Sequence, residues 1–247
     1  MTYCVAIKVD AGLIFCSDSR TNAGVDQVST YSKMYHFGIE GDRQLVINSA
    51  GNLATTQSVI AKIRKDIKDG ADVSLATVEN IHDAADYVGE ISVAIQEKHA
   101  HNNSNVSFEA SFLLGGQIGT ETPAVMLIYP QGNHITTSDQ TPYLQIGESK
   151  YGKPILDRIL KPETGLDTAA LCALVSMDST MRSNLTVGPP IELMTYATNS
   201  GLMQHSVFEA DNQYLRELTR SWDRLIVEAF LQLPPVGYIP TPEPVGQ

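Results

Sequence analysis

Thr2 is the residue of this chain best suited to nucleophilic chemistry. Removal of Met1 would leave its hydroxyl beside a free α-amine. An α-amine has an ordinary pKa of roughly 7.7 to 8.0, so it is partly neutral near pH 7 and can act as the base for that hydroxyl. Such a site needs no histidine. Thr2 alone is weak evidence, because small residues are common after an initiator methionine.

Three further residues have the types and the order that this chemistry needs. Lys33 would supply an ammonium that disfavours protonation of the amine, and Asp18 would hold Lys33 charged and oriented. Gly51, expected to open a helix, could stabilise an oxyanion with its backbone N–H. The product would be an ester on Thr2, later hydrolysed. Taken singly, the three residues have ordinary explanations as a turn carboxylate, a solvated side chain and a turn glycine.

The elements that must position these residues occur as groups of strands and pairs of helices. Strands are expected at 2–9, 12–19, 32–37, 44–50, 108–118, 123–129, 143–147, 191–198 and 202–209, the first two as a hairpin. Helices are expected from Gly51 to a cap at Gly70, over about 81–95, at 153–161 with Pro154 in its first turn, after a cap at Asp167, and over about 212–233. This order favours an α+β fold, a four-layer αββα sandwich of two antiparallel sheets between helical layers.

Composition limits the classes of protein that fit. The 247 residues, 43% of them hydrophobic, can form one domain over 1–247, with an extended proline-rich tail from about 234. The net charge of -11 argues against nucleic acid and anionic membranes as partners. No membrane span or signal peptide is evident, which predicts a cytoplasmic protein. Cys4, Cys16 and Cys172 lack CxxC spacing and favour reduced core thiols, although one reactive cysteine stays an alternative.

Two sequence segments resemble a known family. CSDSRTNAG at 16–24 is similar to the strand-to-loop segment of catalytic proteasome β-subunits, in which Asp-Ser-Arg is characteristic. TYCVAIK followed by SDSRTNAGVD most closely resembles the Anbu family of bacterial proteasome homologues. The resemblance implies the N-terminal nucleophile hydrolase fold. In proteasomes and the related HslV peptidase, the catalytic residues match Thr2, Asp18, Lys33 and Gly51, with Lys33 one position early.

The resemblance also implies a substrate-binding role for three residues. Asn22 matches a loop position whose backbone pairs with substrate in proteasomes. Ser49 and Leu53 match positions of the specificity pocket.

The supporting residues of a proteasome site match less closely. Asp178 and Ser183 lie in MDSTMRSNLTVGPP, which departs from the family's Arg-Asp-x-x-Ser-Gly, so both cannot match without an insertion. Ser149 lies in GESKYG, which replaces the usual Gly-Ser-Gly. These departures bear on the efficiency of catalysis.

The resulting hypothesis is a threonine-type peptidase, without cofactor or metal, inside a homo-oligomeric ring or spiral. Its substrate would be a peptide or unfolded protein, and an unfoldase is a candidate partner. One alternative is a proteasome-like structural subunit with an idle site. Another is an N-terminal nucleophile amidase acting on a small amide. His99 and His101 could ligate a metal, but no third ligand is evident nearby, which favours a solvated loop.

Overall fold

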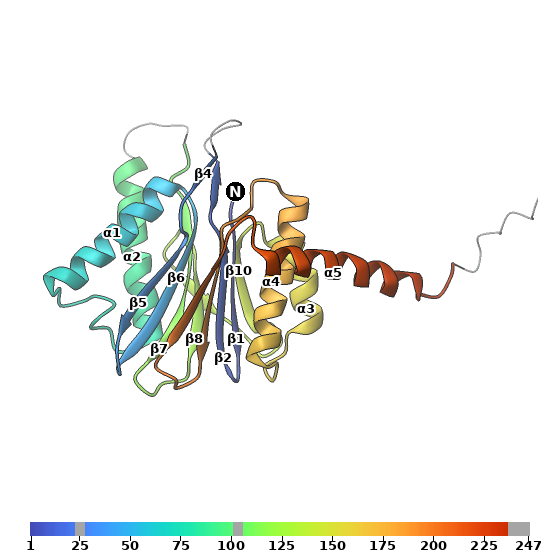
Figure 1. The fold of residues 1–247 in the computed structure, drawn as a ribbon. Helices are drawn as coiled ribbons and strands as arrows, with labels where there is room; N and C mark the ends of the chain where they lie inside the picture. The colour runs from blue at the N-terminus through green and yellow to red at the C-terminus, as the bar shows by residue number, and fades with distance from the viewer. Residues whose placement is uncertain (23–27, 101–105, 237–247) are drawn as a thin grey trace, which may run out of the picture. The chain divides into compact units, whose positions relative to one another are not determined.

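The computed structural model describes residues 1–22, 28–100 and 106–236. The chain divides into two compact units, Met1–Asp211 and Asn212–Gln247. The first unit consists of two antiparallel sheets that lie face to face, with a pair of helices outside each sheet (Figure 1). The predicted α+β sandwich of two antiparallel sheets between helical layers is confirmed for this unit.

The first sheet has the strand order β10-β1-β2-β11-β12. Its strands are β1 (Tyr3–Val9), β2 (Gly12–Asp18), β10 (Tyr143–Gly147), β11 (Ile191–Ala197) and β12 (Met203–Phe208). The predicted hairpin is present, with Cys4 of β1 opposite Ser17 of β2. On its other edge β1 pairs with β10, which sets Tyr3 opposite Gly147. The start of the chain is thus held between the ends of two strands.

The second sheet has the order β5-β6-β7-β8-β9. Its strands are β5 (Met34–Ile39), β6 (Arg43–Gly51), β7 (Ala110–Ile118), β8 (Ala124–Ile128) and β9 (His134–Thr136). A separate ribbon of β3 (Arg20–Asn22) and β4 (Val28–Thr30) follows β2. The sequence did not predict β3, β4 or β9, because strands of 3 residues are too short to show alternation.

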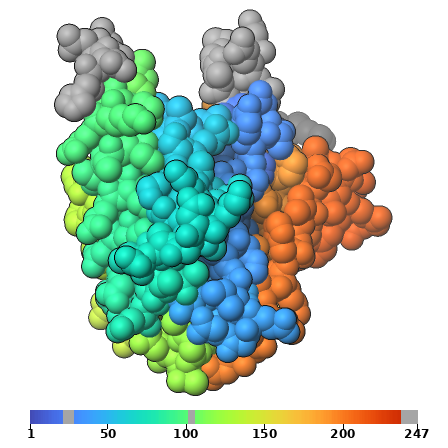
Figure 2. Space-filling model, turned by 90° about the vertical axis from the view of Figure 1, so that its left-hand side faces the viewer, coloured from blue at the N-terminus to red at the C-terminus, as the bar shows by residue number. Residues whose placement is uncertain are grey.

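Two helices cover the outer face of each sheet. Helices α1 (Leu53–Asp69) and α2 (Ile81–Ala100) contact each other and the second sheet. Figure 2 shows α1 and α2 side by side on this face. Helices α3 (Ser149–Ile159) and α4 (Leu166–Ser183) contact each other and the first sheet. The predicted end of α1 is confirmed, since Gly70 adopts φ +66° and its N–H caps the last turn.

Buried apolar side chains pack between the two sheets and between the second sheet and its helices. On β6, Val46 packs between the two sheets, whereas Leu45 and Ile47 pack toward α1 and α2. Side chains of a strand alternate between its faces, so a strand that is buried on both faces needs an unbroken apolar run. That requirement explains the apolar sequences of β1 and β2, in which nearly every residue is buried.

Helix starts differ from the sequence predictions in two places. Helix α3 begins at Ser149, so Pro154 lies inside the helix rather than in its first turn. A proline inside a helix lacks one hydrogen bond. Gly152 and Leu156 of the same helix are buried. Helix α4 has Gly165 as its N-cap, and Asp167 lies in the first turn, where its carboxylate faces the positive end of the helix dipole.

The second unit contains helix α5 (Gln213–Leu231), close to its predicted range. The side chain of Asn212 caps it by accepting a hydrogen bond from the Leu215 N–H at 3.2 Å. The proline-rich tail predicted from about 234 lies outside the described residues from residue 237 onward. No helix in the described ranges combines the length and the apolar character that crossing a membrane requires.

Candidate active site

Thr2 is fixed by the turn that follows β10. Its carbonyl oxygen accepts a hydrogen bond from the Glu148 N–H at 2.8 Å. Gly147 adopts φ +80°, and a Cβ at this position would lie 1.9 Å from the Thr2 oxygen. A glycine is therefore required where the turn contacts Thr2. The next residue, Tyr3, donates its N–H to Oδ1 of Asp18 at 3.0 Å, which draws the start of β1 toward the end of β2.

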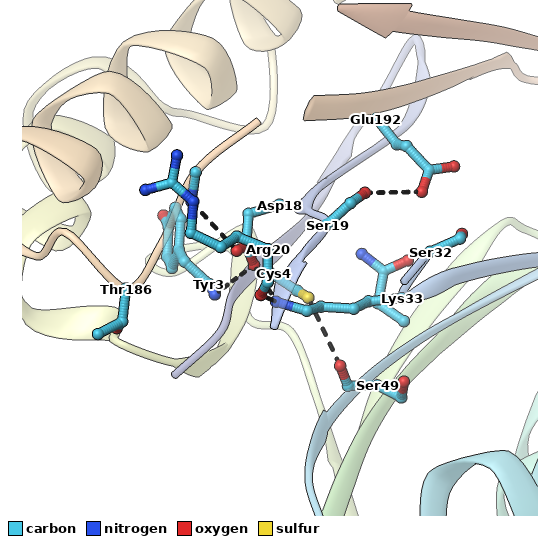
Figure 3. A network of polar contacts seen from close by, with 12 residues as sticks. Tyr3, Cys4, Asp18, Ser19, Arg20, Ser32, Lys33, Ser49, Thr186 and Glu192 are labelled. Atoms are coloured by element: carbon cyan, nitrogen blue, oxygen red, sulfur yellow. Dashed lines mark hydrogen bonds and ion pairs between the residues drawn. The ribbon is translucent and has the colours of Figure 1, made fainter. Parts of the chain in front are cut away.

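Lys33 and Asp18 form a buried ion pair beside the start of β1 (Figure 3). Lys33 Nζ donates to Asp18 Oδ1 at 2.7 Å and to the Arg20 carbonyl oxygen at 2.6 Å. Asp18 Oδ2 accepts a bond from the Gly188 N–H at 3.3 Å. Backbone groups from distant segments thus hold both charges in one orientation.

Burial and nearby charges set the protonation of this site. Burial raises the pKa of Asp18 above its ordinary value, while the charge and hydrogen bond of Lys33 oppose that change. Burial also lowers the pKa of the α-amine, which in the chain with Met1 belongs to that residue, and the charge of Lys33 lowers it further. Asp18 and Glu148 act in the opposite direction on the amine. The Met1 amine is thereby more readily neutral than a solvated α-amine.

Gly51 is the last residue of β6 and does not open the following helix, contrary to the sequence prediction. The N-cap of α1 is Asn52, whose Oδ1 accepts from the Thr55 N–H at 3.2 Å. The correction has a conformational reason: Gly51 has φ +111°, which is far from helical.

The N–H of Gly51 lies on the side of β6 that faces Lys33. Ser49 donates its N–H to the Lys33 carbonyl oxygen at 2.9 Å, whereas Asn52 donates to Glu109 O on the other side at 2.9 Å. In a strand, N–H groups two residues apart point to the same side. The Gly51 N–H therefore shares the side of the Ser49 N–H, where an oxyanion donor would be needed.

These groups meet in a cleft of about 530 Å³. Its walls include Thr2, Lys33, Ser49, Gly51, Leu53 and Glu148. A separate cavity of about 320 Å³ near β5 and α1 has no hydroxyl or thiol among its lining residues. The larger cleft is consequently the better candidate for nucleophilic chemistry.

Solved structures similar to this chain identify its family. Anbu from Yersinia bercovieri, described as an ancestral beta-subunit, is 45% identical with a TM-score of 0.90, over 95% of this chain and 98% of that chain. The chain belongs to the Anbu family. A Gly-1 mutant of Anbu from Hyphomicrobium sp. strain MC1 is 39% identical with a TM-score of 0.89, over 95% of this chain and 99% of that chain.

A third Anbu structure is the helical assembly of the Anbu complex from Pseudomonas aeruginosa. It is 43% identical with a TM-score of 0.89, over 96% of this chain and 100% of that chain. No protein-family model and no curated protein matches the sequence. Membership of the Anbu family confirms the predicted resemblance and the proteasome-like, N-terminal nucleophile hydrolase fold.

The remaining residues predicted from the Anbu and proteasome resemblance lie in different places. Asn22 ends β3, where it pairs with Val28 of β4. Asp178 is buried within α4, and Ser183 ends that helix with an exposed side chain. Ser149 begins α3, and its carbonyl oxygen accepts from Gln145 Nε2 at 3.2 Å. Asp178, Ser183 and Ser149 are not among the described residues that line the cleft.

Glu148 is a charged residue of the cleft that the sequence reasoning missed. It directly follows Gly147, in the segment compared with the family's Gly-Ser-Gly, where Ser149 was chosen as the match. Only 14% of its side-chain surface is exposed. The glutamate next to Ser149 is visible in the sequence. That it lines the cleft depends on the turn at Gly147, which only the tertiary structure shows.

The other candidate chemistries receive less support from the structure. Cys4, Cys16 and Cys172 are free and buried, and burial raises the pKa of each thiol, to about 12 for Cys172. His99 stacks on Phe108 with ring centroids 5.4 Å apart, and His101 lies outside the described residues. Within the described ranges, no three His, Cys, Asp or Glu residues are grouped as metal ligands.

Proposed function

We propose that this chain is a threonine-type peptidase that cleaves peptide bonds once Met1 has been removed. The observation that supports this most is the buried Lys33–Asp18 pair beside Thr2, in a cleft that also contains Gly51. The charge of Lys33 lowers the pKa of the Met1 α-amine. We expect the same effect on the α-amine of Thr2 after processing, which would favour the neutral form that can accept a proton.

The proposed reaction begins when the Thr2 hydroxyl oxygen attacks the carbonyl carbon of the scissile peptide. The α-amine of Thr2 takes the hydroxyl proton, and the Gly51 N–H stabilises the oxyanion. Collapse of the intermediate breaks the C–N bond, the ammonium gives its proton to the leaving amine, and an ester remains on Thr2. A water then attacks the ester, the amine accepts a proton from that water, and the hydroxyl and a carboxylic acid are released.

We also propose that the chain works in the cytoplasm as a homo-oligomer, either a ring or a spiral, on peptides or unfolded proteins. Support comes from the helical assembly of the relative from Pseudomonas aeruginosa. The described part of α5 has no buried residue and exposes apolar side chains such as Leu225, Ile226 and Phe230. An exposed apolar stripe favours association with another protein surface. Light scattering should report many subunits, and a homogeneous monomer at micromolar concentration would contradict this proposal.

Replacing the nucleophile tests the peptidase proposal. Thr2→Ala should abolish hydrolysis of short peptides without unfolding the chain, whereas Thr30→Ala, at an exposed position of β4, should leave the rate unchanged. A peptide with an electrophilic carbonyl should add its mass to residue 2 of the processed protein. Unchanged turnover by Thr2→Ala, with contaminating proteases excluded, would remove Thr2 from the mechanism. Labelling of a cysteine instead would indicate a thiol site.

A proteasome-like structural subunit is the second candidate, because Asp178, Ser183 and Ser149 do not line the cleft. A site without such supporting residues could be assembled and idle. The electrophile distinguishes the two functions, since an idle site would leave residue 2 unlabelled after Met1 removal. An amidase acting on a small amide would be labelled but would not hydrolyse extended peptides.

A further inference from the structure

Glu148 is placed against the nucleophile by its own backbone. Its N–H donates to the Thr2 carbonyl oxygen at 2.8 Å, and the left-handed Gly147 allows the turn to approach Thr2 this closely. Both Glu148 and the N-terminal residues line the same cleft. The hydrogen bond uses the main chain of Glu148, so the carboxylate takes no part in it.

The carboxylate of Glu148 has little access to a neutralising side chain. Its side chain is 14% exposed, and its ion-pair partner is Lys150, whose Nζ lies 3.8 Å from Oε2 and whose side chain is 70% exposed. An exposed ion pair at this distance contributes little and is screened by salt. The carboxylate can therefore pair with a second positive group in the cleft without giving up a strong partner.

Among the described residues that line the cleft, the α-amine, here that of Met1, is the cationic group without an ion pair. The other ammonium there, Lys33, is already bound to Asp18 and to the Arg20 carbonyl oxygen. In the chain with Met1, the charged groups that act on the Met1 α-amine are Lys33 before β5, Asp18 at the end of β2 and Glu148 after β10. Tyr35 of β5 also lines the cleft, with its hydroxyl donated to the Ser32 carbonyl oxygen at 2.9 Å.

We propose that Glu148 is an acidic positioning residue, whose carboxylate pairs with the protonated α-amine and fixes its orientation toward the Thr2 hydroxyl. This inference rests on the proposed function for its role in turnover. The amine becomes an ammonium when it takes the hydroxyl proton, and a fixed negative charge stabilises that ammonium. Lys33 and Glu148 thus act oppositely on the amine: Lys33 favours the neutral resting base, and Glu148 favours the protonated form during attack.

Titration of the α-amine tests the pairing without any need for peptidase activity. We would label the processed protein, with Met1 removal verified by intact mass, with acetic anhydride over a range of pH and follow acetylation of the N-terminal peptide by mass spectrometry. Glu148→Gln should move the midpoint of this curve to lower pH, because the ammonium loses its anionic partner. Glu148→Asp should restore most of the wild-type midpoint. Glu90→Gln, an exposed carboxylate on α2, is the matched control and should leave it unmoved.

The same variants distinguish positioning from a structural role in the processed protein. In Glu148→Gln the limiting rate should fall about tenfold, part of the roughly hundredfold or more that a positioned base contributes. The ascending limb of its pH–rate profile should move to lower pH. If Glu148→Gln folds poorly, Glu148→Ser supplies a smaller neutral side chain for the same two measurements.

Each outcome bears on the proposal separately from the peptidase function. A midpoint that does not move in folded Glu148→Gln or Glu148→Ser would overturn the pairing, as would a Glu148→Asp variant that behaves like Glu148→Gln. A shifted midpoint in a protein that hydrolyses no peptide would support the pairing and contradict only the peptidase function. The labelling uses the processed chain, because the α-amine in the structure belongs to Met1 whereas the proposed pair involves the α-amine of Thr2.

Discussion

Lys33 Nζ lies 2.7 Å from Asp18 Oδ1, and the two side chains are only 7% and 0% exposed. A lysine ammonium in the interior needs such a partner, because desolvation of an unpaired charge costs several kcal/mol. The pair also places a positive charge next to the N-terminus, where it lowers the pKa of the α-amine. The same contact therefore affects both stability and the proposed chemistry.

Lys33→Met should reduce peptide hydrolysis by roughly a hundredfold or more, in the range of a general-base contribution. The ascending limb of the pH–rate profile should also move to higher pH, because an amine without a cationic neighbour keeps its proton longer. Lys33→Arg should recover little activity, since a guanidinium cannot reproduce the two short ammonium contacts. Lys68→Met, at an exposed position of α1, is the control. A wild-type rate and an unmoved profile in Lys33→Met would show that the catalytic assignment is wrong.

Asp18→Asn should lower the free energy of unfolding by about 3–5 kcal/mol, because it leaves the Lys33 charge buried without a counter-charge. The double variant Asp18→Asn with Lys33→Met should recover much of this loss, since neither charge then remains. Urea unfolding at one fixed protomer concentration measures both effects. Equal losses in the single and double variants would mean that the pair contributes by packing alone.

Retention of Met1 should abolish hydrolysis, because the proposed base is the amine of Thr2. Treating the Met1-bearing protein with a methionine aminopeptidase should lower its intact mass by one methionine and produce activity in proportion to the fraction processed. A parallel sample of Thr2→Ala, processed in the same way, should stay inactive. Full activity in a sample whose intact mass shows complete retention of Met1 would contradict the N-terminal mechanism.

Gly147→Ala should displace Thr2 and lower both activity and stability. Its Cβ would lie 1.9 Å from the Thr2 carbonyl oxygen at φ +80°, and a strained backbone of this kind costs about 1–3 kcal/mol. Gly165→Ala is a matched control, because Gly165 has an ordinary φ of -65° and open space around its Cβ position. Gly147→Ala should therefore unfold at a lower temperature and hydrolyse peptides more slowly than Gly165→Ala. Similar behaviour of both would show that the turn does not constrain Thr2.

The sequence by itself determined most of the local structure. Apolar runs predicted the β1–β2 hairpin, and helical periodicity together with Gly70 predicted the extent and end of α1. The order of Thr2, Asp18 and Lys33 was sufficient to suggest one site. These signals are local or depend on residue type, so they are present before the chain folds.

Only the tertiary structure decided how the site is assembled. The Gly188 N–H that binds Asp18, and the turn that brings Glu148 to Thr2, come from segments far along the chain. Gly51 ends β6, and this position fixes the direction of its N–H. The sequence prediction places Gly51 at the start of the next helix instead. Strand pairing and turn conformation fix these contacts, and both depend on long-range packing that no local pattern encodes.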